Sequence, residues 1–360
     1  MSRNKKTAIL VALLLIVMGG ILAMIGYTMT GNDLTQLNTE ELTQETYTIT
    51  EPFDHIHIRT GSSDVRILPS SDGSCTVVCD DESETQYHTV SVEDGILLIH
   101  QVTEPMFFGV MLQYDPVVTV YLPESQYGNL VVDGAAGSIL DVDTSFTFES
   151  ARLTLSSGDI HFRASLTHDL RVRTSSGDIR LSGCHVGGNT QVDASSGSIA
   201  LSDLNTKILA VNGSSGDILL EDIHAQAIQT SASSGSIALS GCEAQQDLSI
   251  QTTSGSVELT EVTAPSLTGN ASSGYFQLQE TFIGGQLFLE TTSGSIFFDA
   301  SDAQSLLINT SSGEVSGTLL SPKFFITHTS SGSVKTSDSD PAGGRCEITT
   351  SSGDIKITAE

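Results

Sequence analysis

A short motif, Ser-Ser-Gly or a close variant of it, recurs through most of this chain at a nearly constant spacing of 19 to 21 residues. A period of this length is typical of solenoids, in which each repeat forms one coil of a stacked array. The motif therefore predicts a stack of coils with one bend in each coil. The glycines that end the motif are Gly137, Gly158, Gly177, Gly197, Gly216, Gly235, Gly255, Gly274, Gly294, Gly313, Gly332 and Gly353.

Apolar and polar residues alternate on both sides of each repeat glycine. In the copy around Gly177, Leu170 and Val172 precede the glycine, and Ile179 and Leu181 follow it. This alternation predicts two short strands, and the change of parity between them requires a bend at Ser-Ser-Gly. Glycine suits such a bend because bends often require a positive φ, which costs other residues about 1–2 kcal/mol. A third inward position, small or apolar, follows about seven residues after each glycine.

Three inward-facing segments in each repeat predict an all-β fold, a parallel β-solenoid whose strands pair with their counterparts about 4.8 Å away in the next coil. We expect about twelve to fourteen coils and a length of about 60 Å. A meander of antiparallel hairpins is the alternative. It is disfavoured because the same bend recurs in every repeat, and the segments between one motif and the next contain no recurring Asn-Gly or Asp-Gly turn, Asn212-Gly213 being a single instance.

The first residues predict a membrane anchor. Arg3, Lys5 and Lys6 precede an uncharged and mostly apolar run over residues 7–27. A helix of that length measures about 31 Å and can cross a bilayer, and the preceding basic residues predict a cytoplasmic N-terminus. The alternative is a cleaved signal peptide, which the length of the run and the lack of a clear Ala-x-Ala site disfavour. We therefore expect a single-pass protein of the cell membrane, with its C-terminal part outside the cytoplasm.

The chain divides by composition into five parts. We expect a cytoplasmic tail over 1–6, the transmembrane helix over 7–27, an acidic stalk over 28–46, an irregular first part or cap of the solenoid over 47–132, and regular repeats over 133–360. In the irregular part, Ser63 stands in the place of the bend glycine. The apolar run over 106–112 is expected to be a core strand, or an interaction patch if it faces solvent.

Charge excludes some partners. All 43 acidic residues lie beyond the expected anchor together with 12 of the 15 basic ones, so this part carries a net charge of −31. Nucleic acid and anionic lipid surfaces are excluded, because both require a positive field. We interpret the negative charge as a feature that keeps the long surface soluble. Divalent-cation binding is the alternative, but the residue after the bend glycine is Asp in only some coils, so no continuous carboxylate column forms.

Cysteines and histidines predict no cofactor or metal. Cys184 and Cys242 share one column three coils apart, about 14 Å by strand spacing and beyond the reach of a disulfide. Cys75 and Cys79 are read as inward core residues, with a Cys-x-x-x-Cys metal site as the alternative. Cys346 occupies a core position. A second alternative for metal is the pair His55 and His57, which share one face of a strand.

Five arginines form the expected binding patch. Arg152 and Arg171 occupy the same position in neighbouring repeats, with Arg163, Arg173 and Arg180 close in sequence. Parallel β-helix enzymes that act on acidic polysaccharides place arginines and carboxylates on one outer face, so a lyase or hydrolase is the alternative function. We expect no enzyme, because the sequence has no Gly-x-Ser-x-Gly, phosphate-loop or zincin motif and no catalytic residue can be assigned.

Several stretches together resemble a known family. Residues 56–67 (Ile-His-Ile-Arg-Thr-Gly-Ser-Ser-Asp-Val-Arg-Ile), 92–99 (Val-Glu-Asp-Gly-Ile-Leu-Leu-Ile), 120–123 (Val-Tyr-Leu-Pro) and the iterated Ser-Ser-Gly-Asp-Ile resemble the bacterial β-strand-repeat proteins labelled "putative adhesins", domain of unknown function 4097. The resemblance covers 47–360. It implies a β-solenoid on a membrane-anchored envelope protein and no catalytic residues.

The expected function combines these observations. The protein is predicted to be a non-enzymatic cell-envelope scaffold or adhesin-like binding surface, and a sensor or regulator arm for envelope stress is a further alternative. Its expected partners are the membrane, through the N-terminal helix, and a cell-wall glycan or a surface protein.

Overall fold

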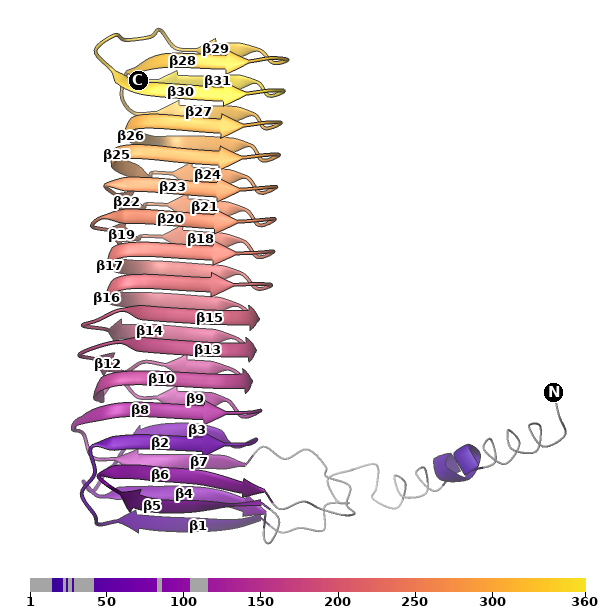
Figure 1. Cartoon of the computed structure of the whole chain (residues 1–360), viewed down its shortest axis with the longest axis vertical. Coiled ribbons are helices and arrows are strands. Elements are labelled where there is room, and N and C mark those ends of the chain that lie inside the picture. Colours follow the sequence, from indigo (N-terminus) through magenta and orange to yellow (C-terminus); the bar gives the residue numbers. More distant parts are fainter. Residues whose placement is uncertain (1–14, 22–23, 25–27, 29–41, 83–85, 104–115) are drawn as a thin grey trace, which may run out of the picture.

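The computed structural model describes residues 15–21, 24, 28, 42–82, 86–103 and 116–360. Apart from helical residues between 15 and 28, its regular structure consists of β-strands. These strands form one tall stack of about twelve turns, with coils of about 20 residues (Figure 1). The parallel β-solenoid predicted from the repeat is therefore confirmed.

Each regular coil contributes to three faces of the stack. Face 1 holds the strands that precede the bend. From the N-terminal to the C-terminal end it contains β5 (Gln86–Glu93), β6 (Ile96–Thr103), β2 (His55–Thr60), β8 (Gln126–Gly134), β10 (Thr147–Ser157), β13 (Leu170–Ser176), β15 (Thr190–Ser196), the ends of β16 (Ile199–Gly213) and β17 (Ile218–Ala232), β20 (Asp247–Thr252), β23 (Ser266–Ala271), the ends of β25 (Phe282–Thr291) and β26 (Ile296–Thr310), β30 (Gly344–Thr350) and β28 (Lys323–Thr329).

Faces 2 and 3 follow the bend. Face 2 contains β1 (Leu42–Ile49), β4 (Cys75–Glu82), β7 (Val117–Leu122), β3 (Asp64–Pro69), β9 (Ile139–Val142), β11 (Ile160–Phe162), β14 (Ile179–His185), the starts of β16 and β17, β18 (Ile237–Ser240), β21 (Val257–Thr260), β24 (Phe276–Gln279), the start of β26, β27 (Val315–Leu319), β31 (Ile355–Ala359) and β29 (Val334–Thr336). The narrow face 3 contains the start of β10, β12 (Ser165–Leu166), the middle of β16 and β17, β19 (Glu243–Ala244), β22 (Thr263–Ala264), the start of β25 and the middle of β26.

The regular coils pair in parallel and in register. Val172 of β13 lies opposite Val192 of β15, which lies opposite Val211 of β16, and all three side chains are buried. The inward residues of successive coils form one continuous hydrophobic core from Ile56 to Ile357. Stability therefore comes from stacking each coil on its neighbours, as in other repeat proteins.

Both ends depart from chain order. The last coil in sequence, β30 and β31, is inserted between the coil of β26 and β27 and the outermost coil of β28 and β29 (Figure 1). At the other end, β2 and β3 lie between β6 and β7 on one side and β8 and β9 on the other. The antiparallel strands β1, β4 and β5 close the N-terminal end. Because β1 begins at residue 42, this cap begins inside the segment 28–46 that was expected to be a stalk.

A second corner, between faces 2 and 3, was not predicted. It lies six residues after the bend glycine and has a positive φ in seven coils: Gly183, Asp203, Asp222, Gly241, Glu261, Glu280 and Ala300. Asp or Glu occupies this corner in most of these coils. No single residue type recurs there, so the sequence alone does not reveal the corner. Left-handed backbone costs non-glycine residues about 1–2 kcal/mol each.

The expected membrane span over 7–27 falls largely outside the described residues. Within the part of the chain that the structure describes, helical stretches are too short to cross a bilayer. The apolar run over 106–112 also lies outside the described residues.

Candidate functional site

The bend glycines line one edge of the stack, where backbones of successive coils approach closely. A Cβ atom on Gly235 would lie 1.8 Å from the carbonyl oxygen of Gly216, and one on Gly255 would lie 1.7 Å from that of Gly235. Positive φ angles are found at only three of the bend glycines, Gly158, Gly177 and Gly197. A positive φ, the reason given for glycine at the bend, therefore applies to only these three coils among the bend glycines, and close stacking is what requires glycine in the others.

Polar side chains beside the bend satisfy its backbone groups. Thr291 Oγ1 accepts a hydrogen bond from the Gly294 N–H at 3.1 Å and donates one to the Gly274 carbonyl oxygen at 3.3 Å. The residue after the glycine forms a hydrogen bond to the next coil. Asp217 Oδ1, for example, accepts a hydrogen bond from the Ser236 N–H at 2.9 Å. These contacts explain why Asp or Ser follows most bend glycines. The many serines and threonines at this edge are structural.

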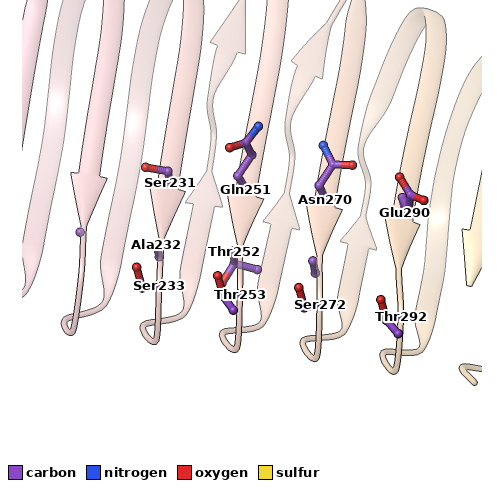
Figure 2. Close-up of a pocket in the computed structure, with 12 residues that line it drawn as sticks. Ser231, Ala232, Ser233, Gln251, Thr252, Thr253, Asn270, Ser272, Glu290 and Thr292 are labelled. Carbon is purple, nitrogen blue, oxygen red and sulfur yellow. The ribbon is translucent and has the colours of Figure 1, made fainter. Parts of the chain in front are cut away.

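Outward side chains of face 1 form a polar ladder next to the bend edge. Asn212 Nδ2 donates to Asp193 Oδ1 at 2.8 Å, and Ser231 Oγ donates to Asn212 Oδ1 at 2.7 Å. The ladder continues into an open groove of about 490 Å³, where side chains of successive coils point outward in a row (Figure 2). Hydroxyl, carboxamide and carboxylate groups line it, among them Ser231, Gln251, Asn270, Glu290 and Thr292. Such a surface can exchange hydrogen bonds with an extended polar ligand.

A second groove of about 460 Å³ lies on face 1 nearer the N-terminal end, and it is lined by Arg152 and Arg171, among others. These arginines occupy paired positions on β10 and β13, and Arg173 follows on the same outward face. Arg152 lies 3.5 Å from Asp133, whereas Arg171 and Arg173 have no carboxylate within ion-pair distance among the described residues. The structure thus brings together three arginines of the expected patch.

The other two arginines of the expected patch lie elsewhere. Arg163, which follows β11, contacts Asp141 at 2.9 Å, and Arg180 on face 2 contacts Asp178 at 3.0 Å. Both are thus neutralised by neighbouring carboxylates. The five arginines do not form one basic surface.

A buried Ser, His and Asp constellation lies in the N-terminal cap. His88 Nδ1 is 2.5 Å from Asp81 Oδ1, and His88 Nε2 is 3.0 Å from Ser63 Oγ. This order of contacts is that of a serine hydrolase. However, the exposed fraction is 0% for Ser63, 2% for His88 and 3% for Asp81, so a substrate cannot reach it in this structure. The constellation joins β4 and β5 to the first bend.

Sequence reasoning missed this constellation because its members come from three separate strands and loops of the irregular part. Ser63 in the place of a bend glycine was the only available signal. Nearby, Gln101 Oε1 accepts hydrogen bonds from the N–H groups of Gly61 and Ser62. Polar contacts therefore hold the bend of β2 and β3, and Gly137 of the next coil stacks on Ser63 as later bend glycines do on one another.

The cysteines are core residues. All five thiols are free and buried, which confirms the prediction that Cys184 and Cys242 do not form a disulfide. Burial raises the pKa of the Cys184 thiol to about 12 and that of Cys242 to about 11. Such thiols are poor nucleophiles and poor metal ligands at neutral pH.

The two histidines considered as metal ligands contact protein groups instead. His55 Nδ1 accepts a hydrogen bond from the Asn129 N–H at 2.8 Å, and His57 Nε2 lies 3.3 Å from Asp133 Oδ2. No group of three or more His, Cys, Asp or Glu side chains is arranged to hold a metal ion within the described ranges.

Comparisons with known proteins found similar solved structures and a sequence family. Among solved structures, a "putative adhesin" from Bacteroides fragilis NCTC 9343 is 13% identical, covers 89% of this chain and 97% of its own, and has a TM-score of 0.38. A "putative adhesin" from Parabacteroides distasonis ATCC 8503 is 15% identical, with coverages of 78% and 98% and a TM-score of 0.36. A "putative lipid binding protein" from the same strain is 17% identical, with coverages of 88% and 96% and a TM-score of 0.29.

No curated protein sequence matches the chain. The sequence model of the Toastrack DUF4097 family matches residues 53–190 and again residues 188–358. The two matches together span nearly the whole solenoid. The chain therefore belongs to the Toastrack DUF4097 family.

Proposed function

We propose that this protein is a non-enzymatic cell-envelope protein, anchored by its N-terminus, that displays a rigid β-solenoid as an adhesin-like binding surface. The observation that carries the proposal is the polar ladder of face 1, which repeats the same outward positions in coil after coil. A ligand that is itself an extended polymer could contact many coils at once. Weak contacts in series then give high avidity.

The proposed anchor rests on the sequence before the solenoid. Arg3, Lys5 and Lys6 precede the apolar run 7–27, and a helical segment over 15–21 lies inside this run. This arrangement supports a cytoplasmic N-terminus and an external solenoid. Mechanical signalling from the envelope is compatible with a rigid arm of this kind.

Two features of the structure support a non-enzymatic role. The Ser63, His88 and Asp81 side chains are buried, and the arginines that suggested an enzyme for acidic polysaccharides are divided between face 1 and the region of face 2. A displayed binding surface is the simpler reading of the same residues.

To test this proposal, the full-length protein is displayed on cells. The amounts of fluorescent cell-wall glycan and of envelope fragments that these cells capture are then measured. A variant with Gln251→Ala, Asn270→Ala and Glu290→Ala should capture less, because it removes hydrogen-bonding groups from the groove in Figure 2. Glu221, Gln277 and Gln279 lie on face 2 outside that groove, and their replacement by Ala is the matched control. If wild-type cells capture nothing above cells without the protein, the proposal fails.

A further inference from the structure

Face 3 carries a trough around Phe282 that the polar ladder does not include. Two grooves of about 750 and 350 Å³ meet there and share Phe282 and Gly284. We propose that this trough binds a short oligosaccharide of neutral or amino sugars. The inference rests on the proposed display function, and it adds a site and a ligand class to it.

Phe282 supplies the platform. Its side chain is 43% exposed, and its position on β25 lies opposite Thr263 of β22 on one side and Asp302 of β26 on the other. Glu243 of β19 continues the row. Neighbouring positions are about 4.8 Å apart. An aromatic ring in line with hydroxyl and carboxylate groups fits a sugar, whose C–H face packs on the ring while its hydroxyl groups form hydrogen bonds.

Two glycines line the trough beside the Phe282 ring and add no side chain to it. The pairing of β25 with β26 shifts register between Ile283 and Gln286, and Gly284 and Gly285 fill the shift. A Cβ atom on Gly285 would lie 2.8 Å from the Pro265 carbonyl oxygen. Ala264 also lines the trough, so small residues lie beside the ring.

A buried lysine, Lys323, holds the carboxylate of Asp302 at the C-terminal end of the trough. Lys323 is only 2% exposed, and its Nζ lies 2.6 Å from Asp302 Oδ1. It also donates to the Ala303 carbonyl oxygen at 2.8 Å and to Ser321 Oγ at 2.6 Å. These contacts use all three N–H donors of the ammonium group. Asp302 is therefore held in place, with Oδ2 without a hydrogen-bond partner among the described residues.

The carboxylates that line the trough favour neutral or cationic sugars over anionic ones. Glu243 and Asp302 are both acidic, Lys323 has no donor left, and His224 lies 3.5 Å from Glu243. An anionic sugar would meet repulsion, and among the described residues that line the trough no other cation balances it. Neutral hydroxyl groups can donate to these carboxylates, and the ammonium group of an amino sugar can pair with them.

The test measures binding of three β-linked tetrasaccharides to the full-length protein in detergent micelles by saturation-transfer NMR and calorimetry. The probes are a glucose, a glucosamine and a glucuronate tetrasaccharide. We expect the first two to bind and the glucuronate to bind at least about tenfold more weakly. Phe282→Ala should weaken binding at least about tenfold, because the stacking platform is lost, whereas Phe282→Tyr should keep most of it.

Phe297→Ala is the matched control, because Phe297 is 44% exposed on face 2 and lines neither groove. It should leave binding unchanged. The inference is overturned if none of the sugars binds, if glucuronate binds best, if Phe282→Ala binds as wild type does, or if only a basic peptide competes for the trough. If none of the sugars binds the purified protein while displayed wild-type cells still capture envelope material, this inference is overturned and the proposed function stands.

Discussion

A Cβ atom on Gly216 would lie 1.9 Å from the carbonyl oxygen of Gly197 in the preceding coil. The overlap is with backbone, so no side-chain rotation can relieve it, and the two coils would have to separate at the bend. We expect Gly216→Ala to lower the free energy of unfolding by about 1–3 kcal/mol, as overpacking does. Chemical denaturation of the full-length protein in detergent, followed by circular dichroism, measures this loss.

Gly213→Ala is the control in the same coil. Its Cβ atom would lie 3.4 Å from Ile218 Cδ1, which is an ordinary contact. Alanine already occupies the equivalent position at Ala194 and Ala232. This variant should be neutral or more stable by up to about 1 kcal/mol, because glycine weakens strands. Equal losses in both variants would contradict the explanation by stacking.

The residue after the bend glycine gives a second prediction. Asp217 Oδ1 accepts a hydrogen bond from the Ser236 N–H at 2.9 Å, so Asp217→Ala should cost about 0.5–1.5 kcal/mol. Asp217→Ser should cost less, because Ser138 Oγ accepts the equivalent N–H of Asp159 at 3.1 Å. Denaturation midpoints of the two variants test the order. A Ser variant as damaging as the Ala variant would argue against this role.

The second corner predicts a gain in stability. Glu261 has a φ of 54°, a conformation that glycine adopts without the strain of a Cβ atom. Glu261→Gly should therefore stabilise the protein by up to about 1 kcal/mol, the strain being partly offset by the greater freedom of glycine in the unfolded chain. The reverse change, Gly241→Glu, should destabilise it at the equivalent corner, where φ is 63°. Thermal melts of both variants should move in opposite directions.

These cases show what the sequence could and could not predict. The alternation around Gly177 was enough to predict two strands and a bend, because inward positions in a solenoid must be apolar in every coil. The physical role of Gly216 could not be predicted, since close stacking and positive φ both select glycine. The corner at Asp203 was hidden because Asp, Glu and Gly alternate there.

The functional residues were harder to predict than the fold. Arg152 and Arg171 were placed together because they share one position in the repeat, whereas Arg163 and Arg180 were grouped with them only by closeness in sequence. Ser63, His88 and Asp81 meet through the antiparallel cap, whose pairing has no repeat to reveal it. The repeat thus predicts contacts between coils and says little about the irregular end.

Thiol ionisation gives a pH-dependent prediction. Burial raises the pKa of Cys79 and Cys346 to about 12, against 9.0 in an unfolded chain. Below pH 9 the thiols are protonated in both states. Above it the unfolded chain loses protons that the native protein keeps, so stability should fall by up to about 1.4 kcal/mol per pH unit and per thiol. Urea unfolding at pH 8 and pH 10 measures this fall, and Cys346→Ala should show a smaller one.

Native thiols should also resist labelling. At pH 8 a thiol reagent should modify none of the five cysteines in the folded protein, and all five after denaturation without a reductant. Rapid labelling of the native protein would mean that the coils open readily, and a missing thiol after denaturation would reveal a disulfide.

Removal of one whole coil tests the architecture as a unit. Deleting the 19 residues from Gly216 to Ser234 brings Gly235 onto Gly197, since Gly216 lies on Gly197 and Gly235 lies on Gly216. It also leaves a corner residue, Gly241, above Asp203. Each coil contacts only its neighbours, so the shortened protein should remain folded with its β-sheet circular dichroism spectrum and lose one rung of about 4.8 Å.

Deleting only the ten residues from Gly216 to Ala225 is the matched comparison. It removes one bend glycine and part of β17 and shifts the following residues by half a coil. The exposed Ser233 then falls at the inward position of Ile223, and the next bend glycine, Gly235, falls at the face 3 position of Ala225. This variant should lose cooperative melting in the surrounding coils. The two deletions share one site and differ in whether they respect the repeat, so similar melting behaviour in both would show that neighbouring coils do not depend on the register seen between β16, β17 and β18.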